Sequence, residues 1–327
     1  MNQQAQPTQL PSQTNDPKPP YILSLDVGTS STRTLLFDSL GATVTRVHAQ
    51  RQYQLTTSVE GEVSVDADAL VDLVGQTISD ALRACGPMAQ QLGAVAIDTF
   101  WHSLVGVDES NQAITPVITW EDTRPYNASM ELKKQLNEEE IHKRTGASLH
   151  ASYWPAKLRW LATEQPDTFK RATQWISFGE YLHRRFLGKS VCSLSMASAT
   201  GMFDTRKQQW DEELMHVLDV RPEQLPQLGD IRDSITGLSS QYASAWPVLR
   251  NVPWYPAIGD GAAAGVGSGC ANLDNWSLTI GTSSAIRVVM PPDKATPPMG
   301  LWLYLVDAKR GIMGGALSEG GNVLNWL

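Results

Sequence analysis

The stretch YILSLDVGTSSTRTLLFD, residues 21–38, carries the strongest structural signal in this chain. An apolar, β-rich run over residues 21–25 is interrupted by Gly28 and several hydroxyl residues, and it resumes over residues 34–37. This pattern predicts a β-hairpin in which Gly28 supplies a positive φ. The N–H groups and hydroxyls of the turn can surround an anion, and Asp26 can face a cation. From these residues alone, an ordinary hairpin with a polar turn is an equal alternative.

A second copy of the motif, WSLTIGTSSAIRVV at residues 276–289, follows about 250 positions later. Two such hairpins on facing sheets could hold the phosphates of a nucleotide from both sides. Between them, at residues 258–270, Asp260 opens a run of small residues that predicts a close-packed helix. The helix dipole stabilises a carboxylate at this end in its charged form. A simple N-cap role for Asp260 is the alternative.

Together these motifs resemble the FGGY family of carbohydrate kinases, and within it the gluconokinase branch. The resemblance implies an α/β, actin-like (ribonuclease H-like) ATPase fold with a complete first domain and an incomplete second domain. It divides the chain into a disordered leader at 1–20, an N-terminal domain at 21–270 and the start of an ATP-binding domain at 271–327. The matching runs are Leu25–Arg33, Val117–Arg124, Lys143–Gly146, Ser195–Met202 and Thr279–Arg287.

The resemblance also implies roles for residues and two cofactors, ATP and Mg²⁺. Phosphoryl transfer requires that the γ-phosphoryl group be positioned, that its charge be offset, and that the acceptor hydroxyl be deprotonated. In such kinases the catalytic base corresponds to Asp260, and the carboxylate near Mg²⁺ corresponds to Asp26, acting through a metal-bound water. The residues expected at the ATP phosphates are Thr29, Ser30, Ser31 and Arg33 in the first turn, and Gly281 and Thr282 in the second.

The sugar pocket is expected at a polar break between two strands, where Trp101 and His102 lie. Gluconokinase-like relatives tend to carry Met-His there, so Trp101 departs from the pattern and His102 keeps it. Asp122 belongs to a Trp-Xaa-Asp motif of the family, and we expect it to accept a substrate hydroxyl. Apart from the resemblance, a structural role is the more common one for a lone His or Asp at a strand end.

The implied activity is transfer of the γ-phosphoryl group of ATP to a hydroxyl of a sugar or sugar acid, with gluconate as the first candidate. One alternative is a catalytically silent sugar-binding protein without the adenosine half. Another is a xylulokinase-like or other pentulose or polyol kinase, because few pocket residues decide among such substrates. A chaperone-type ATPase of the same superfamily would leave the sugar-side motifs without a purpose.

Composition is consistent with a cytoplasmic enzyme. The 327 residues are 42% hydrophobic, with a net charge of −8, and the sequence pI is about 5.3. An acidic chain without a Lys/Arg-rich block argues against a nucleic-acid partner, and no apolar run reaches the roughly 18 residues of a membrane span. The three cysteines lack metal-ligand spacing, so we expect reduced thiols and no zinc site. The expected partner is a small sugar or sugar acid, and a homodimer is left open.

Helical spacing of apolar residues predicts a helix over residues 67–83, and residues 124–220 are expected to be mainly helical. In the expected helix at 179–187, Glu180 and His183 are placed on the solvated side. The pattern at 314–327 has no C-terminal cap, and family members continue beyond it. We therefore expect a fragment or a truncated gene product, with apolar surface exposed on the second domain.

Overall fold

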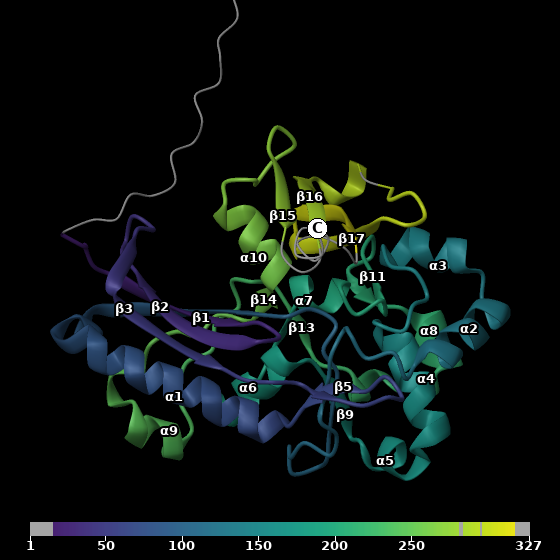
Figure 1. The fold of residues 1–327 in the computed structure, drawn as a ribbon, viewed down its shortest axis with the longest axis horizontal. Coiled ribbons are helices and arrows are strands. Elements are labelled where there is room, and N and C mark those ends of the chain that lie inside the picture. The colour runs from purple at the N-terminus through teal and green to yellow at the C-terminus, as the bar shows by residue number, and fades with distance from the viewer. Residues whose placement is uncertain (1–15, 281–283, 295, 318–327) are drawn as a thin grey trace, which may run out of the picture.

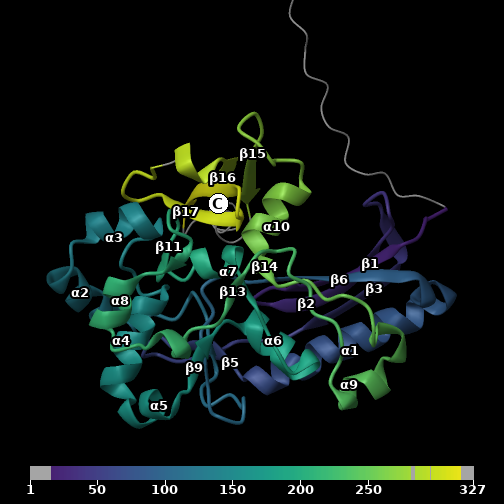
Figure 2. The same ribbon diagram turned by 180° about the vertical axis from the view of Figure 1, so that it is seen from behind.

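The structure is a computed structural model that describes residues 16–280, 284–294 and 296–317. A five-stranded sheet forms near the N-terminus, and a four-stranded sheet forms from the last described residues (Figure 1). A lobe of helices lies beside both sheets, and the view from behind shows α10 next to the smaller sheet (Figure 2). None of the helices described is long and apolar enough to span a membrane.

The larger sheet has the strand order β14-β6-β1-β2-β3. β1 and β2 pair antiparallel, which confirms the predicted hairpin, while β6 runs parallel to β1. Gly28 does not adopt the positive φ expected of it; instead its N–H donates to Ser31 O at 3.0 Å and closes the turn. The strands are β1 (Tyr21–Val27), β2 (Ser31–Phe37), β3 (Thr43–Gln52), β6 (Leu92–Thr99) and β14 (Ile258–Gly259).

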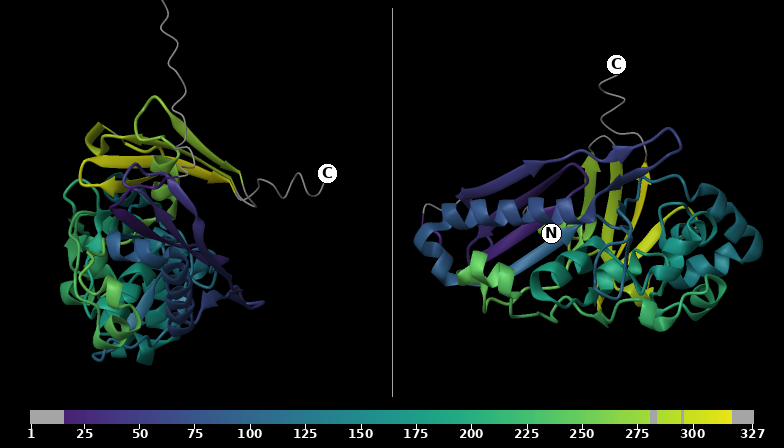
Figure 3. Two further views of the ribbon diagram at one scale, coloured as in Figure 1. Left: turned by 90° about the vertical axis from the view of Figure 1, so that its left-hand side faces the viewer. Right: turned by 90° about the horizontal axis from the view of Figure 1, so that it is seen from below.

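Helix α1 (Ala67–Cys85) covers one face of this sheet, against β2 and β3 (Figure 3). Asp66 begins it, because its side chain accepts a hydrogen bond from Ala69 N at 2.8 Å. The buried stripe that the sequence predicts includes Leu70, Val74 and Ile78. Each such side chain stabilises the fold by about 1.5–3 kcal/mol when fully buried. The predicted helix is confirmed and extends two residues further.

Residues 124–220 form the mainly helical lobe that the sequence predicts. Its core contains Trp154 and Trp175, both fully buried, and Trp154 stacks on Trp210 with ring centroids 6.1 Å apart. The helices are α2 (Tyr126–Gln135), α3 (Glu138–Thr145), α4 (Trp154–Glu164), α5 (Pro166–Arg171), α6 (Phe178–Leu187), α7 (Leu194–Ser198) and α8 (Glu212–Val217).

Short elements connect the larger ones. The short strands are β4 (Thr56–Thr57), β5 (Val63–Val65), β7 (Val105–Val107), β8 (Val117–Ile118), β9 (Gln174–Ile176), β10 (Cys192–Ser193), β11 (Phe203–Asp204), β12 (Gln209–Trp210) and β13 (Leu228–Gly229). The short helices are η1 (Gly86–Gln91), η2 (Pro222–Gln224), α9 (Ser240–Ala245), η3 (Pro247–Leu249) and η4 (Pro292–Lys294).

The smaller sheet follows α10 (Asp260–Gly267) and has the antiparallel order β15-β16-β18-β17. Its edge strand exposes apolar side chains, since Trp276, Leu278 and Ile280 are 61%, 63% and 62% exposed. The expectation of exposed apolar surface on this part of the chain is confirmed. The strands are β15 (Trp276–Ile280), β16 (Ser284–Met290), β17 (Trp302–Asp307) and β18 (Arg310–Leu317).

The predicted disordered leader is only partly within the described residues, because residues 1–15 lie outside them. The expectation is wrong for residues 17–20, which contact the hairpin. Tyr21 Oη donates to Pro17 O at 2.9 Å, and Ser39 N donates to Lys18 O at 2.9 Å. Backbone carbonyls of this segment therefore help to fix the start of β1.

Glu180 and His183 of α6 are buried, so their predicted solvation is wrong. Glu180 Oε2 accepts the N–H of Ser177 at 2.8 Å and closes a capping box at the start of the helix. His183 faces the ring of Trp254, with centroids 6.5 Å apart. Burial lowers the pKa of His183 to about 4, because an imidazolium is costly to remove from water.

Acidification is expected to destabilise the protein through His183. The imidazole gains its proton near pH 6.5 when unfolded and near 4 when folded, so stability falls as pH drops below about 6.5. Relative to pH 8, the residue should lower the free energy of unfolding by about 2 kcal/mol at pH 5. Urea denaturation of the protein and of His183→Leu at both pH values tests this. Identical pH dependence in the two proteins would contradict it.

Candidate active site

Three carboxylates meet at one edge of the larger sheet, where β1, β6 and β14 end. The strand register pairs Asp26 with Asp98, and it pairs Asp98 with Ile258, two residues before Asp260. Burial, together with the neighbouring Asp26 and Asp260 carboxylates, raises the pKa of Asp98. Asp98 is not among the site residues predicted from the sequence. The signal that could have revealed it is its place at the end of an apolar strand, which matches that of Asp26.

Several polar groups of the first predicted phosphate turn already form contacts with other side chains of the protein. Arg33 forms an ion pair with Asp26 across the hairpin. Ser31 Oγ accepts a hydrogen bond from Gln50 Nε2 at 3.2 Å. Thr29 lines the large cavity described below, and Ser30 is exposed. Gly281 and Thr282 of the second turn lie outside the described residues.

The donor set at this edge fits a hydrated divalent cation. Among the described residues, no group of three or more His, Cys, Asp or Glu side chains could hold a metal ion by itself. Mg²⁺ needs no such cage, because it keeps several waters and binds through one or two carboxylates together with substrate phosphates. Asp26, whose side chain is 23% exposed, is open to such a contact.

A cavity of about 600 Å³ opens between the sheet edge and the smaller sheet. Its lining includes Trp101, His102 and Asp260, all three of which were predicted from the sequence, and Arg287 and Tyr304 of the smaller sheet. The latter two were not selected as site residues, although Arg287 closes the second matched motif. The cavity combines aromatic surface, hydroxyls and opposite charges.

Trp101 packs directly beneath Asp260. Its indole Nε1 donates to Ser195 O at 3.2 Å, and the ring lies against Gly259 and Gly261. A Cβ placed on Gly259 would come within 1.8 Å of the indole Nε1, and one on Gly261 within 2.5 Å of the ring. The two glycines that flank Asp260 are therefore required by the close approach of this ring.

Gly259→Ala is expected to destabilise the protein by about 2 kcal/mol, because overpacking displaces the Trp101 ring. The matched control is Gly267→Ala at the end of α10, where an added Cβ would meet nothing within 4 Å. That control should be neutral or slightly stabilising, by about 0.5–1 kcal/mol. Thermal and urea denaturation check the pair, and equal effects of the two substitutions would contradict the prediction.

His102 occupies a left-handed turn, with φ of 64°. The turn is held by Lys157, whose ammonium donates to His102 O at 2.6 Å and to Ile118 O at 3.2 Å. The His102 ring is neutral, since burial lowers its pKa to about 3. Its Nδ1 lies 2.5 Å from Ala199 O, a group that can only accept. The proton is therefore on Nδ1, and Nε2 is left as a hydrogen-bond acceptor.

Asp260 begins α10, as predicted, and its carboxylate is held from two sides. Its Oδ1 accepts the N–H of Gly261 at 2.7 Å, and the backbone N–H of Trp101 also donates to the carboxylate. Burial nevertheless raises the pKa of Asp260 to about 6, against the opposing effects of these hydrogen bonds and of Arg287. A carboxylate with this pKa can take up and release a proton near neutral pH.

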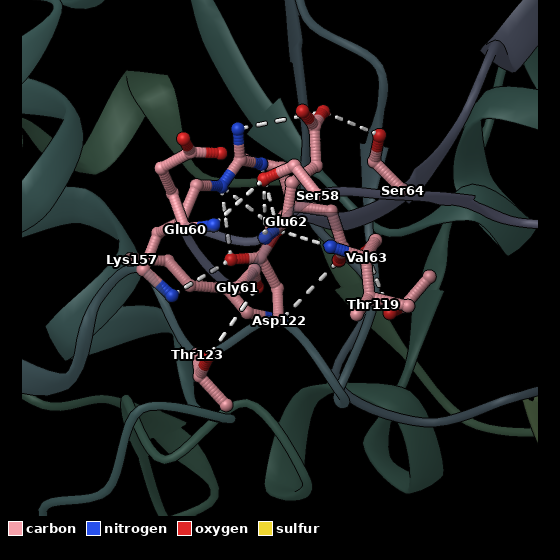
Figure 4. A network of polar contacts seen from close by, with 12 residues as sticks. Ser58, Glu60, Gly61, Glu62, Val63, Ser64, Thr119, Asp122, Thr123 and Lys157 are labelled. Carbon is pink, nitrogen blue, oxygen red and sulfur yellow. Dashed lines mark hydrogen bonds and ion pairs between the residues drawn. The ribbon is translucent and has the colours of Figure 1, made fainter.

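Asp122 does not line the cavity. It is 1% exposed, and its oxygens accept hydrogen bonds from Arg124 Nη2 at 2.6 Å and from Val63 N at 3.1 Å (Figure 4). Arg124 also lies 3.4 Å from Glu62 Oε1. The carboxylate thus ties β5 to the loop after β8. We correct the expectation of a hydroxyl acceptor accordingly, because both oxygens serve internal contacts.

Residues 21–267 match the N-terminal domain of the FGGY family of carbohydrate kinases. The chain belongs to this family. The match includes the first hairpin, the three carboxylates and α10, and the described part of the smaller sheet follows it. FGGY kinases are phosphotransferases that act on carbohydrates.

Curated and solved FGGY kinases agree with this assignment. The gluconokinase of Bacillus subtilis (strain 168) is 26% identical over 307 residues, 94% of this chain and 59% of that protein. Solved structures of xylulose kinase and gluconate kinase from Lactobacillus acidophilus give TM-scores of 0.86 and 0.85, each at 27% identity over 94% of this chain and 61% of the other. The predicted actin-like α/β fold is confirmed, and the chain spans about 60% of the length of these relatives.

Proposed function

We propose that this FGGY protein transfers the γ-phosphoryl group of ATP to a hydroxyl of a sugar or sugar acid, with gluconate as the acceptor. The observation that carries the proposal is Asp260. It stands in the wall of the large cavity, at the sheet edge reached by the β1–β2 turn, and its pKa is about 6. A positioned base of this kind speeds proton removal by about 10²- to 10⁴-fold.

The chemistry assigned to the site is an in-line displacement. The acceptor hydroxyl passes its proton to Asp260 as its oxygen bonds to the γ-phosphorus, and the bond between that phosphorus and the β,γ-bridging oxygen breaks to release ADP. Thr29, Ser30 and Ser31 would position the phosphates, together with Gly281 and Thr282. Asp26 would hold Mg²⁺ nearby, and the bound ion would neutralise part of the phosphate charge.

The acceptor would lie on the aromatic side of the cavity. Trp302 and Tyr304 stack with centroids 4.5 Å apart, and Trp101 meets Tyr304 edge-on at 5.1 Å. Such rings suit the apolar face of a carbohydrate. The acceptor nitrogen of His102 suits one of its hydroxyls.

Other parts of the proposal rest on the family assignment alone. They are a division into an N-terminal domain at 21–270 and the start of an ATP-binding domain at 271–327, and a cytoplasmic location. The second candidate function, which the large cavity alone would support, is a protein that binds the acceptor without phosphorylating it.

An assay that couples ADP release to NADH oxidation tests the proposal over gluconate, xylulose, ribulose, glycerol and fuculose. The expected result is turnover, with the highest kcat/KM for gluconate. A preference for xylulose would keep the reaction class and replace the acceptor. No turnover on any of the five, alongside saturable binding of one of them by calorimetry, would favour the binding protein.

A further inference from the structure

Arg287 is the one Arg or Lys side chain among the described residues that line the large cavity. It stands on β16, in the part of the wall that the smaller sheet supplies. The two histidines of the cavity wall add little positive charge, because burial lowers the pKa values of both His102 and His150. The positive charge of this wall is therefore concentrated in one guanidinium.

The guanidinium of Arg287 is incompletely paired. Its Nη1 donates to Thr279 Oγ1 at 3.1 Å, while its Nε is buried and has no hydrogen-bond partner. Among the residues that the structure describes, no carboxylate forms an ion pair with it within 4.0 Å. A buried donor without a partner is unfavourable, and more so when the group is charged. Nε itself is out of reach of a ligand, but Nη2 and the second hydrogen of Nη1 can donate to acceptor oxygens in the cavity, because the side chain as a whole is only partly buried.

Asp260 is not an ion-pair partner of the Arg287 guanidinium. The two side chains attract each other, since Asp260 opposes the lowering of the Arg287 pKa by burial, yet they do not form an ion pair within 4.0 Å. The Arg287 side chain instead lies over the start of α10, where a Cβ on Gly261 would come within 3.1 Å of its Nε. The cavity thus presents a carboxylate and an unpaired guanidinium as separate groups. A ligand with a hydroxyl and an anionic group suits this pair.

Arg287 lies midway along β16, close to the second predicted phosphate turn. Ser284 directly follows the second predicted phosphate turn, and Arg287 is three residues further along the strand. With a rise of about 3.3 Å per residue, their Cα atoms are about 10 Å apart. The guanidinium reaches back toward the start of the strand, because its Nη1 donates to Thr279 Oγ1 and Thr279 pairs with Ala285.

We propose that Arg287 binds a carboxylate of the acceptor, so that the site selects an aldonic acid over the neutral polyol of the same chain length. The assignment rests on the proposed function, because it takes the large cavity as the acceptor site. A guanidinium matches a carboxylate with two parallel N–H donors, which an ammonium cannot do. Selectivity follows because a neutral polyol leaves the guanidinium unpaired.

Calorimetric titration with D-gluconate and with D-glucitol, its uncharged counterpart, tests the proposal without ATP. For Arg287→Met we expect binding of gluconate to weaken about 10- to 100-fold and that of glucitol to change by less than about threefold. Arg287→Lys should restore part of the gluconate affinity. Arg83→Met, at an exposed arginine of α1 outside the cavity, should change neither.

Three outcomes would overturn the assignment. Equal weakening of gluconate and glucitol in Arg287→Met would show a general role in shaping the cavity. Unchanged gluconate affinity in that variant would show that the carboxylate binds elsewhere. If the unaltered protein binds neither these ligands nor any other acceptor of the panel, the cavity is not an acceptor site, and the proposed function fails together with this inference.

Discussion

Asp260→Asn is expected to lower the rate of phosphoryl transfer to gluconate by about 10²- to 10⁴-fold, the range for loss of a positioned general base. Asparagine keeps the shape of the side chain and can still accept the N–H of Gly261, which Asp260 holds at 2.7 Å. It cannot take the hydroxyl proton. The Kd of the acceptor, measured by calorimetry, should therefore stay within about threefold of that of the unaltered protein, while kcat falls by the factor given above.

The pH profile offers a second readout of the same substitution. Burial raises the pKa of Asp260 to about 6, so the basic form grows as pH rises through 6, and kcat should rise with it and level off above 7. The residual activity of Asp260→Asn should lack this rise. A kcat loss of less than tenfold, or the same inflection in the variant, would refute the base assignment. Asp274→Asn, at an exposed loop position, is the control.

Asp122→Ala should lower the free energy of unfolding by about 3–5 kcal/mol, the effect of removing one partner from a buried ion pair. The Asp122 side chain is 0% exposed and that of Arg124 is 17% exposed. After the substitution, Arg124 keeps Glu62 at 3.4 Å, while Val63 N loses its acceptor. Urea denaturation with tryptophan fluorescence measures the change.

Asp122→Asn is the matched control, because it removes the charge and keeps an oxygen that can accept from Val63 N. It should destabilise the protein less than Asp122→Ala does. Below the unfolding transition, both variants should bind gluconate as the unaltered protein does. Specific loss of acceptor binding in a fully folded Asp122 variant would contradict our placement of this residue outside the sugar site.

Local signals in the sequence were sufficient for the first hairpin, for α1 and for the start of α10. The hairpin follows from two apolar runs separated by a short polar turn, and α1 follows from a repeat of buried residues such as Leu70 and Val74. In each case the information lies within about twenty neighbouring positions, where periodicity and turn chemistry act directly. Asp260 and the Trp101–His102 pair were located in this way and by motif resemblance.

Contacts between distant segments could not be predicted in this way. Asp98 joins the carboxylate cluster because β6 pairs in parallel with β1, a register that no local pattern specifies. The motif around Asp122 predicts a pocket residue, yet its carboxylate oxygens accept hydrogen bonds from Val63 and Arg124. His183 is polar on an amphipathic helix and still faces inward, where it meets Trp254. Each outcome depends on which surfaces the folded chain brings together.

The interlocking of Trp101 with Gly259 and Gly261 also constrains how this protein can evolve. A smaller residue at position 101 would enlarge the pocket, but it would leave a void under the turn that carries Asp260. Conversely, no larger residue can enter on either side of Asp260 while the indole stays. Changes of acceptor preference at position 101 should therefore arise through paired substitutions, in which a smaller side chain there is accompanied by a larger one at 259 or 261.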